Sequence, residues 1–155
     1  QFWEHLERPL NAFDAALAAP NASFIVECKK ASPSKGLIRA TFDLDEIIHA
    51  YAPHAACISV LTDEKYFQGT FEYLRYVTDR VHQPVINKDF FVVPYQVHLA
   101  RYYGADAILL MLSVLTDDEY RELARLAKSY HMDVLTEVSN AEEMQRAITL
   151  RAHLI

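Results

Sequence analysis

Glycine is scarce in this chain, and its scarcity limits the possible ligands. Only Gly36, Gly69 and Gly104 occur among the 155 residues. Nucleotide-binding folds use a glycine-rich turn after the first strand, because the backbone there must approach a phosphate closely. Here that turn is residues 29–36, and it has neither the Gly-x-Gly-x-x-Gly pattern nor a Walker A pattern. A glycine-rich phosphate cradle is therefore excluded within this sequence.

Cysteine is scarcer still. Cys28 and Cys57 each lie in an apolar run, and they are not spaced as a Cys-x-x-Cys motif. We therefore expect two reduced core thiols in a cytoplasmic protein. The seven histidines have no metal-ligand spacing with a second histidine or a cysteine, so no metal site is expected.

The sequence also lacks a basic stripe and a long apolar run. The formal net charge of −6 argues against nucleic acid or an anionic membrane surface as the main partner. No apolar run approaches the length that spans a membrane. An anionic small-molecule substrate would have to be bound by local positive groups.

What the sequence does contain is an alternation of two periodicities. Apolar runs predict strands at residues 24–29, 57–61, 84–88, 107–112 and 134–138. Apolar stripes at three- and four-residue intervals predict helices at 44–51, 71–81, 94–104 and 116–130, and one beginning near 139. The expected helix caps are Asp43 with Glu46, Thr116 with Glu119, and Ser139 with Glu142.

Strands that alternate with helices predict a parallel sheet with crossover helices. Apolar strands of this kind are covered on both faces, either in a (β/α)8 TIM barrel or in an open doubly wound sheet. Eight units would need about 250 residues, so length favours the open sheet and a barrel would be truncated.

The domain prediction is one partial (β/α)8 barrel over residues 1–155. Residues 1–22 form an N-terminal helical extension with a break at Pro9, in which Leu10, Phe13 and Leu17 face the body. Residues 23–155 then hold strands one to five, and His153 opens a sixth. Because Gln1 is not methionine and the chain stops inside this apolar run, we expect a piece of a longer barrel.

Charged residues at the ends of apolar strands favour the barrel. Glu27 and Lys29 lie two apart on the first strand, Lys88 ends the third, and Glu137 lies near the end of the fifth. Singly, each has a structural explanation: an ion pair, a lysine that reaches solvent, or a carboxylate at a helix N-terminus. Together they would meet at the carboxyl-end mouth, where barrel enzymes keep their catalytic groups.

Several segments resemble motifs of indole-3-glycerol-phosphate synthase. They are residues 27–36 (ECKKASPSKG), 59–69 (SVLTDEKYFQG), 88–90 (KDF), 109–111 (LLM) and 135–138 (LTEV), in that order. The resemblance runs from about residue 23 to 150, and long motifs in the same order make it specific.

The resemblance implies a carboxy-lyase of tryptophan biosynthesis. Its phosphorylated substrate, 1-(2-carboxyphenylamino)-1-deoxyribulose 5-phosphate, closes a ring and loses carbon dioxide and then water, with no cofactor or metal. Lys88 resembles the general acid and Glu137 the acid/base group of the dehydration, while Lys29 resembles a ligand of anionic groups that Glu27 fixes. Pocket-lining positions implied by the resemblance are Ser32, Phe67, Phe90, Leu109 and Met111.

Two departures from the family pattern matter. The asparagine, glutamate, serine and glycine-rich loops of strands six to eight are absent, so we expect this chain alone to be inactive. Arg151 stands where the family usually has a glycine, which is costly if that site needs a positive φ. Some members of the family are fused to a phosphoribosylanthranilate isomerase domain, so such a fusion is open for the parent protein.

Two other interpretations stay open. Lys88 could form a Schiff base in another barrel lyase or aldolase. Alternatively, the chain could be a non-catalytic half-barrel that self-associates through its open sheet edges and apolar interior.

Overall fold

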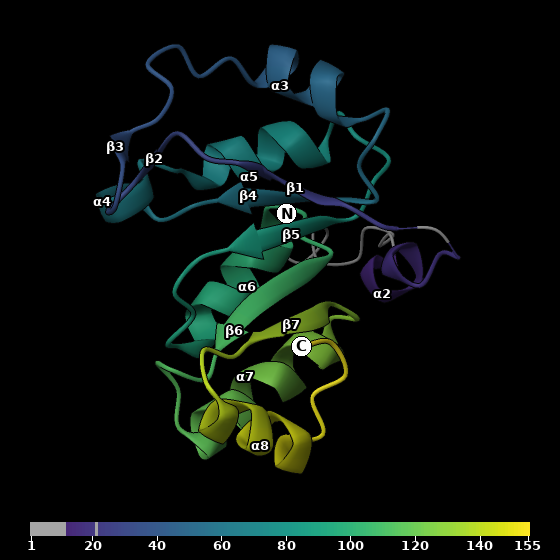
Figure 1. Cartoon of the computed structure of the whole chain (residues 1–155), viewed down its shortest axis with the longest axis vertical. Helices are drawn as coiled ribbons and strands as arrows, with labels where there is room; N and C mark the ends of the chain where they lie inside the picture. Colours follow the sequence, from purple (N-terminus) through teal and green to yellow (C-terminus); the bar gives the residue numbers. More distant parts are fainter. Residues whose placement is uncertain (1–11, 21) are drawn as a thin grey trace.

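The computed structural model describes residues 12–20 and 22–155. Their framework is a five-stranded parallel sheet whose spatial order follows the chain (Figure 1). In that order the strands are β1 (Ile25–Cys28), β4 (Cys57–Leu61), β5 (Val85–Lys88), β6 (Ala107–Met111) and β7 (Asp133–Glu137).

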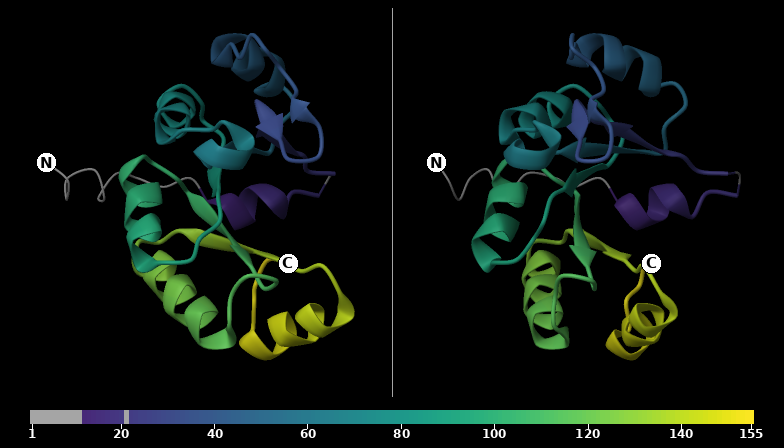
Figure 2. Two further views of the ribbon diagram at one scale, coloured as in Figure 1. Left: turned by 90° about the vertical axis from the view of Figure 1, so that its left-hand side faces the viewer. Right: turned by 60° about the vertical axis from the view of Figure 1, so that its left-hand side comes forward.

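A helix follows each strand, and these helices lie around one side of the curved sheet (Figure 2). They are α3 (Leu44–Tyr51), α5 (Phe71–Thr78), α6 (Pro94–Tyr102), α7 (Asp117–Ser129) and α8 (Ala141–Leu150), with a short α4 (Glu64–Phe67) before α5. A doubly wound sheet reverses its strand order and carries helices on both faces. The unbroken order β1-β4-β5-β6-β7 is that of a barrel, so the predicted truncated (β/α)8 arrangement is confirmed.

Alternation along the strands divides the apolar residues between two layers. Outward-facing side chains such as Val60 and Val85 pack against Leu74 and other helix residues in the larger core. Inward-facing Cys57 and Ile86 belong to a smaller cluster on the concave face. Both cysteines are buried free thiols, as predicted.

The helix α2 (Phe13–Leu17) packs against this smaller cluster. Phe13 is fully buried, and its carbonyl accepts a hydrogen bond from Cys57 Sγ at 3.8 Å. The Asp14 amide donates to Asp133 Oδ2 at 3.0 Å. Phe13 therefore faces the body as predicted, whereas Pro9 and Leu10 lie outside the described residues.

The helix caps test the sequence predictions residue by residue. Asp43 accepts hydrogen bonds from the backbone of α3, and Thr116 and Glu119 form the predicted capping box of α7. The predicted cap of α8 is wrong by one residue, because Asn140 Oδ1 rather than Ser139 receives the Glu143 amide at 2.9 Å. Glu143 Oε2 in turn accepts from the amide of Ser139, the residue that precedes the N-cap residue.

Two local features complete the described chain. An antiparallel pair, β2 (Ala31–Ser32) and β3 (Gly36–Leu37), follows β1 and was not predicted. The predicted sixth strand is represented by one parallel bridge between Leu135 and Leu154. Among the described helices, none has the length and apolarity needed to cross a membrane.

Arg151 adopts a left-handed conformation at the end of α8, with φ at 56° and ψ at 42°. A side chain is strained in this region and glycine is not, so we expect Arg151→Gly to stabilise the protein by about 1 kcal/mol. Urea unfolding measures this difference. The control, Thr149→Gly, places glycine at an exposed helical position and should destabilise by about 0.4 kcal/mol, since threonine is already a poor helix former. If the Arg151→Gly variant is no more stable than the parent protein, the inferred backbone strain at residue 151 is contradicted.

Candidate active site

An ion triad occupies the carboxyl end of the sheet. Glu27 Oε1 accepts a hydrogen bond from Lys29 Nζ at 2.5 Å, and Oε2 accepts one from Lys88 Nζ at 2.8 Å. Glu27 lies on β1 and Lys29 directly follows the last residue of that strand, while Lys88 ends β5, two strands away. The carboxylate thus holds two ammonium groups from different strands at fixed positions.

Burial and charge act in opposite directions on Glu27. Burial alone would raise the pKa of this carboxyl, since desolvation disfavours its charged form. The hydrogen bonds and positive charges of Lys29 and Lys88 outweigh burial, and the pKa of Glu27 lies below its ordinary value. The side chains are about a quarter to a third exposed, so water screens part of this attraction.

Two cavities adjoin the triad, and Lys88 and Glu137 line both of them. The first has a volume of about 160 Å³ and a mainly apolar wall. Its apolar lining residues are Leu61, Phe67, Phe90, Leu109 and Met111. The second lies deeper on the concave face, where Glu27 and Ser59 also line it.

Aromatic rings form one side of the first cavity. The Phe67 and Phe90 ring centroids are 6.1 Å apart, and the Tyr66 and Phe90 rings are nearly perpendicular with centroids 6.4 Å apart. Phe67 ends α4, which Asp63 caps by accepting hydrogen bonds from the Tyr66 and Phe67 amides. An apolar wall of this kind suits a flat aromatic ligand group.

Gly69 closes the segment that carries Phe67. A Cβ at this glycine would lie 2.2 Å from the Leu61 carbonyl oxygen, a distance that real side chains do not tolerate. The absence of a side chain therefore lets the α4 segment pack directly against the end of β4.

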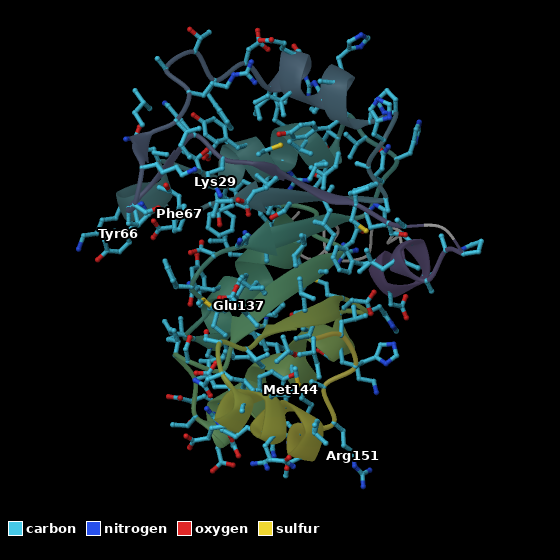
Figure 3. All side chains as sticks on the ribbon, in the orientation of Figure 1. Lys29, Tyr66, Phe67, Glu137, Met144 and Arg151 are labelled. Carbon is cyan, nitrogen blue, oxygen red and sulfur yellow. The ribbon has the colours of Figure 1, made fainter. Side chains whose placement is uncertain are left out.

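The structure brings most of the predicted site residues together. Lys88, Glu137, Phe67, Phe90, Leu109 and Met111 line the first cavity, and Glu27 lines the second. Figure 3 shows Lys29, Phe67 and Glu137 on the same side of the molecule. Neither set of lining residues includes Ser32 or Lys29. Ser32 lies in β2, where its hydroxyl accepts from the Lys35 amide at 3.3 Å.

The residues that sequence reasoning missed lie inside motifs it had already singled out. Asp63 and Asp89 line the first cavity beside Lys88. Burial raises the pKa of Asp89 despite a hydrogen bond from Thr62, and the neighbouring charge of Asp63 adds to the rise. Their position directly after β4 and β5 was the available signal, since the ends of parallel strands share one edge.

The donor set at this site suits proton transfer better than metal binding. Among the described residues, no group of three or more histidine, cysteine or carboxylate side chains could hold a metal ion. The site instead offers two ammonium groups, carboxylates in different environments and an apolar wall. Such pairs of acid and base groups serve general acid–base catalysis.

Comparisons with known proteins bear on the family and the fold of the chain. A family model described as indole-3-glycerol phosphate synthase matches residues 3–155. The chain is 62% identical over 150 residues to the tryptophan biosynthesis protein TrpCF of Vibrio cholerae, covering 97% of this chain and 32% of that protein. It is 56% identical over 158 residues to TrpCF of Haemophilus influenzae, covering all of this chain and 33% of that protein. The chain thus spans about a third of the length of these relatives.

Solved structures share the fold at low sequence identity. A mandelate oxidase variant solved with (S)-mandelic acid matches with a TM-score of 0.62 at 13% identity, covering 96% of this chain and 52% of that chain. Phosphoribosylanthranilate isomerase from Thermotoga maritima matches with a TM-score of 0.55 at 16% identity, covering 82% and 60%.

Replacing Glu27 tests the electrostatic role of the triad. Because the folded-state pKa of Glu27 is depressed, its stabilisation is present above its ordinary pKa of 4.5 and is lost as pH falls through the lowered value. We expect Glu27→Gln to destabilise by about 1 kcal/mol at pH 7, with the difference shrinking below pH 4.5. Urea unfolding at several pH values measures this.

The control is Glu46→Gln, which removes an exposed ion pair with Arg39 at 3.1 Å. We expect a stability change below about 0.5 kcal/mol for this control. A Glu27→Gln effect that is as small, or that does not vary with pH, would refute the assigned role of the carboxylate.

Proposed function

Since the chain belongs to the indole-3-glycerol phosphate synthase family, we propose that it supplies the acid–base part of that active site in tryptophan biosynthesis. The proposed reaction is ring closure of 1-(2-carboxyphenylamino)-1-deoxyribulose 5-phosphate, with loss of carbon dioxide and water. The single observation that carries this proposal is the Glu27–Lys29–Lys88 triad beside an apolar cavity that Glu137 also lines.

Lys88 is suited to the first step. The ring carbon that bears the carboxylate attacks the ribulose carbonyl carbon. The carbonyl oxygen then becomes negative and needs a proton. The Lys88 ammonium would supply this proton, while its bond to Glu27 at 2.8 Å fixes the donor's position. Carbon dioxide then leaves and the ring regains its aromaticity.

Glu137 is suited to the dehydration. The new hydroxyl must leave as water with one added proton, and the adjacent methylene must lose a proton. Within the described residues Glu137 takes part in no ion pair, so its carboxyl is available to a substrate in either cavity. We assign it the acid/base role in this step.

The remaining proposed contacts bind the substrate. Phe67, Phe90, Leu109 and Met111 would hold the anthranilate ring against the apolar wall. Lys29 would bind an anionic group, since its charge is oriented by Glu27 at the edge of the site. Ser32 stays a predicted ligand, offered from the hairpin after β1.

The proposal also covers the location, cofactors and partners of the enzyme. We propose a cytoplasmic enzyme that uses no cofactor and engages neither nucleic acid nor membrane. The TrpCF relatives are about three times as long as the matched segment, which leaves room for the proposed fusion to a phosphoribosylanthranilate isomerase domain.

A Schiff-base mechanism is the weaker enzyme alternative. The Lys88 ammonium donates to a carboxylate, and a protonated amine is not a nucleophile. Borohydride trapping of a covalent adduct on Lys88 would favour that alternative.

Self-association is a separate proposal with its own observation. β1 and β7 end the sheet order, and the β1 residue Ile25 remains 39% exposed on the concave face. Open strand edges and exposed apolar side chains favour pairing with a second copy. Sedimentation equilibrium of the chain alone tests this, and a monomer at high protein concentration would refute it.

The proposed activity is best tested in a chimera. This chain replaces the matched segment of Vibrio cholerae TrpCF, and formation of indole-3-glycerol phosphate is followed by its fluorescence. We expect the chimera to turn over and the chain alone not to. Lys88→Met should lower kcat at least 100-fold, about the contribution of one general acid.

The control is Lys65→Met, which removes an exposed lysine of α4 near the same end of the molecule. It should leave kcat within about twofold. A folded chimera that is inert, or one in which Lys88→Met retains activity, would overturn the proposed function.

A further inference from the structure

Thr62 contacts three consecutive residues, 87–89, through its backbone amide and its hydroxyl. The Thr62 amide donates to the Lys88 carbonyl at 3.2 Å and extends the pairing of β4 with β5. The Thr62 hydroxyl donates to Asp89 Oδ2 at 2.6 Å and accepts from Asn87 Nδ2 at 2.7 Å. Thr62 thus holds the residue before Lys88, the Lys88 peptide itself and the residue after it.

Two members of this network, Thr62 and Asn87, lie behind the candidate active site. Thr62 and Asn87 alternate with Leu61 and Lys88, so they point to the helix-covered face while Lys88 points to the concave one. Thr62 is 2% exposed and Asn87 is fully buried. The preceding outward-facing residues of these strands are apolar, and polar side chains interrupt the pattern only at the strand ends.

The interruption is costly for folding alone. Asn87 Oδ1 is buried without a hydrogen-bond partner among the described residues, and an unpaired buried polar atom is destabilising. An apolar trio of similar volume would avoid this cost. Thr62, Asn87 and Asp89 instead fix the orientation of the strand end, because hydrogen bonds are directional whereas apolar contacts allow the strand to slide.

The same network reaches the cavity wall. Asp89 Oδ1 accepts from the Phe90 amide at 2.8 Å, so Asp89 joins Thr62 to the backbone of a ring that lines the cavity. A shift of Thr62 would therefore move Lys88 and Phe90 together.

We propose that Thr62 is a positioning residue, whose hydroxyl holds the end of β5 so that the Lys88 ammonium stays on Glu27 and faces the cavity. Positioning of the ammonium follows from the contacts alone. Its consequence for turnover rests on the proposed function above.

The experiment compares Thr62→Val, which removes the hydroxyl at nearly equal volume, with Thr62→Ser, which keeps it. The first readout is the pKa of Glu27, followed by carbon-13 NMR of its labelled carboxyl. Because Lys88 helps to lower this pKa, we expect Thr62→Val to raise it toward 4.5 and Thr62→Ser to leave it unchanged. The control Thr78→Val removes a buried hydroxyl that donates to the Arg75 and Tyr103 carbonyls, away from the site.

The second readout is kcat in the active chimera. We expect about a tenfold loss in Thr62→Val with KM within twofold, and recovery in Thr62→Ser, since misplacing a proton donor lowers rate more than binding. The titration needs no activity, so an inert chimera would refute the proposed function while leaving the positioning test intact.

Asp89→Asn is the variant to titrate if Thr62→Val does not fold. It leaves one oxygen to accept from two donors, the Thr62 hydroxyl and the Phe90 amide, so we expect the same direction of change in the pKa of Glu27. An unchanged Glu27 titration in a folded Thr62→Val, or in Asp89→Asn where the valine variant fails, would overturn the proposal.

Discussion

The parallel register of the sheet is the constraint on which the rest of the structure depends. It sets Glu27 beside Ser59, Leu61 beside Lys88 and Met111 beside Glu137. Because side chains alternate between faces, each strand sends its last inward residue to the same mouth. A slip of one residue in any strand would exchange the concave face with the helix-covered face and separate the charges that now meet.

That constraint makes the ion triad possible and gives it a defined shape. Three charged side chains that stood alone on a surface would be fully hydrated and would move freely. Here Glu27 lies between two lysines, so neither ammonium can leave without exposing a half-buried carboxylate. The apolar wall supplies the complementary part, because a drier site strengthens the same charges when a ligand displaces water.

The sequence allowed the sheet, its helices and most of the residues that line the two cavities to be predicted, and the reasons are physical. Periodicity located β4 and α3 at their true bounds, and charges at the ends of apolar strands identified Lys88 and Glu137. The cap of α8 was placed one residue early, since Ser139 and Asn140 are both good capping residues and only the backbone decides between them. Asp63 and Asp89 were missed because a polar residue after a strand is also what an ordinary loop contains.

A second hydroxyl suggests why outward-facing polar residues stand at these strand ends. Thr136, which precedes Glu137 on β7, is 1% exposed, and its hydroxyl hydrogen-bonds the buried Tyr120 hydroxyl of α7 at 2.7 Å. Thr62 instead follows β4 and bonds the end of the neighbouring strand β5, so two strand ends that carry charged residues each have a buried threonine behind them. Packing alone fixes a strand to its helices only within the tolerance of apolar contacts. A proton donor must be placed more narrowly than that, and a directional bond close behind it is the economical way to do so.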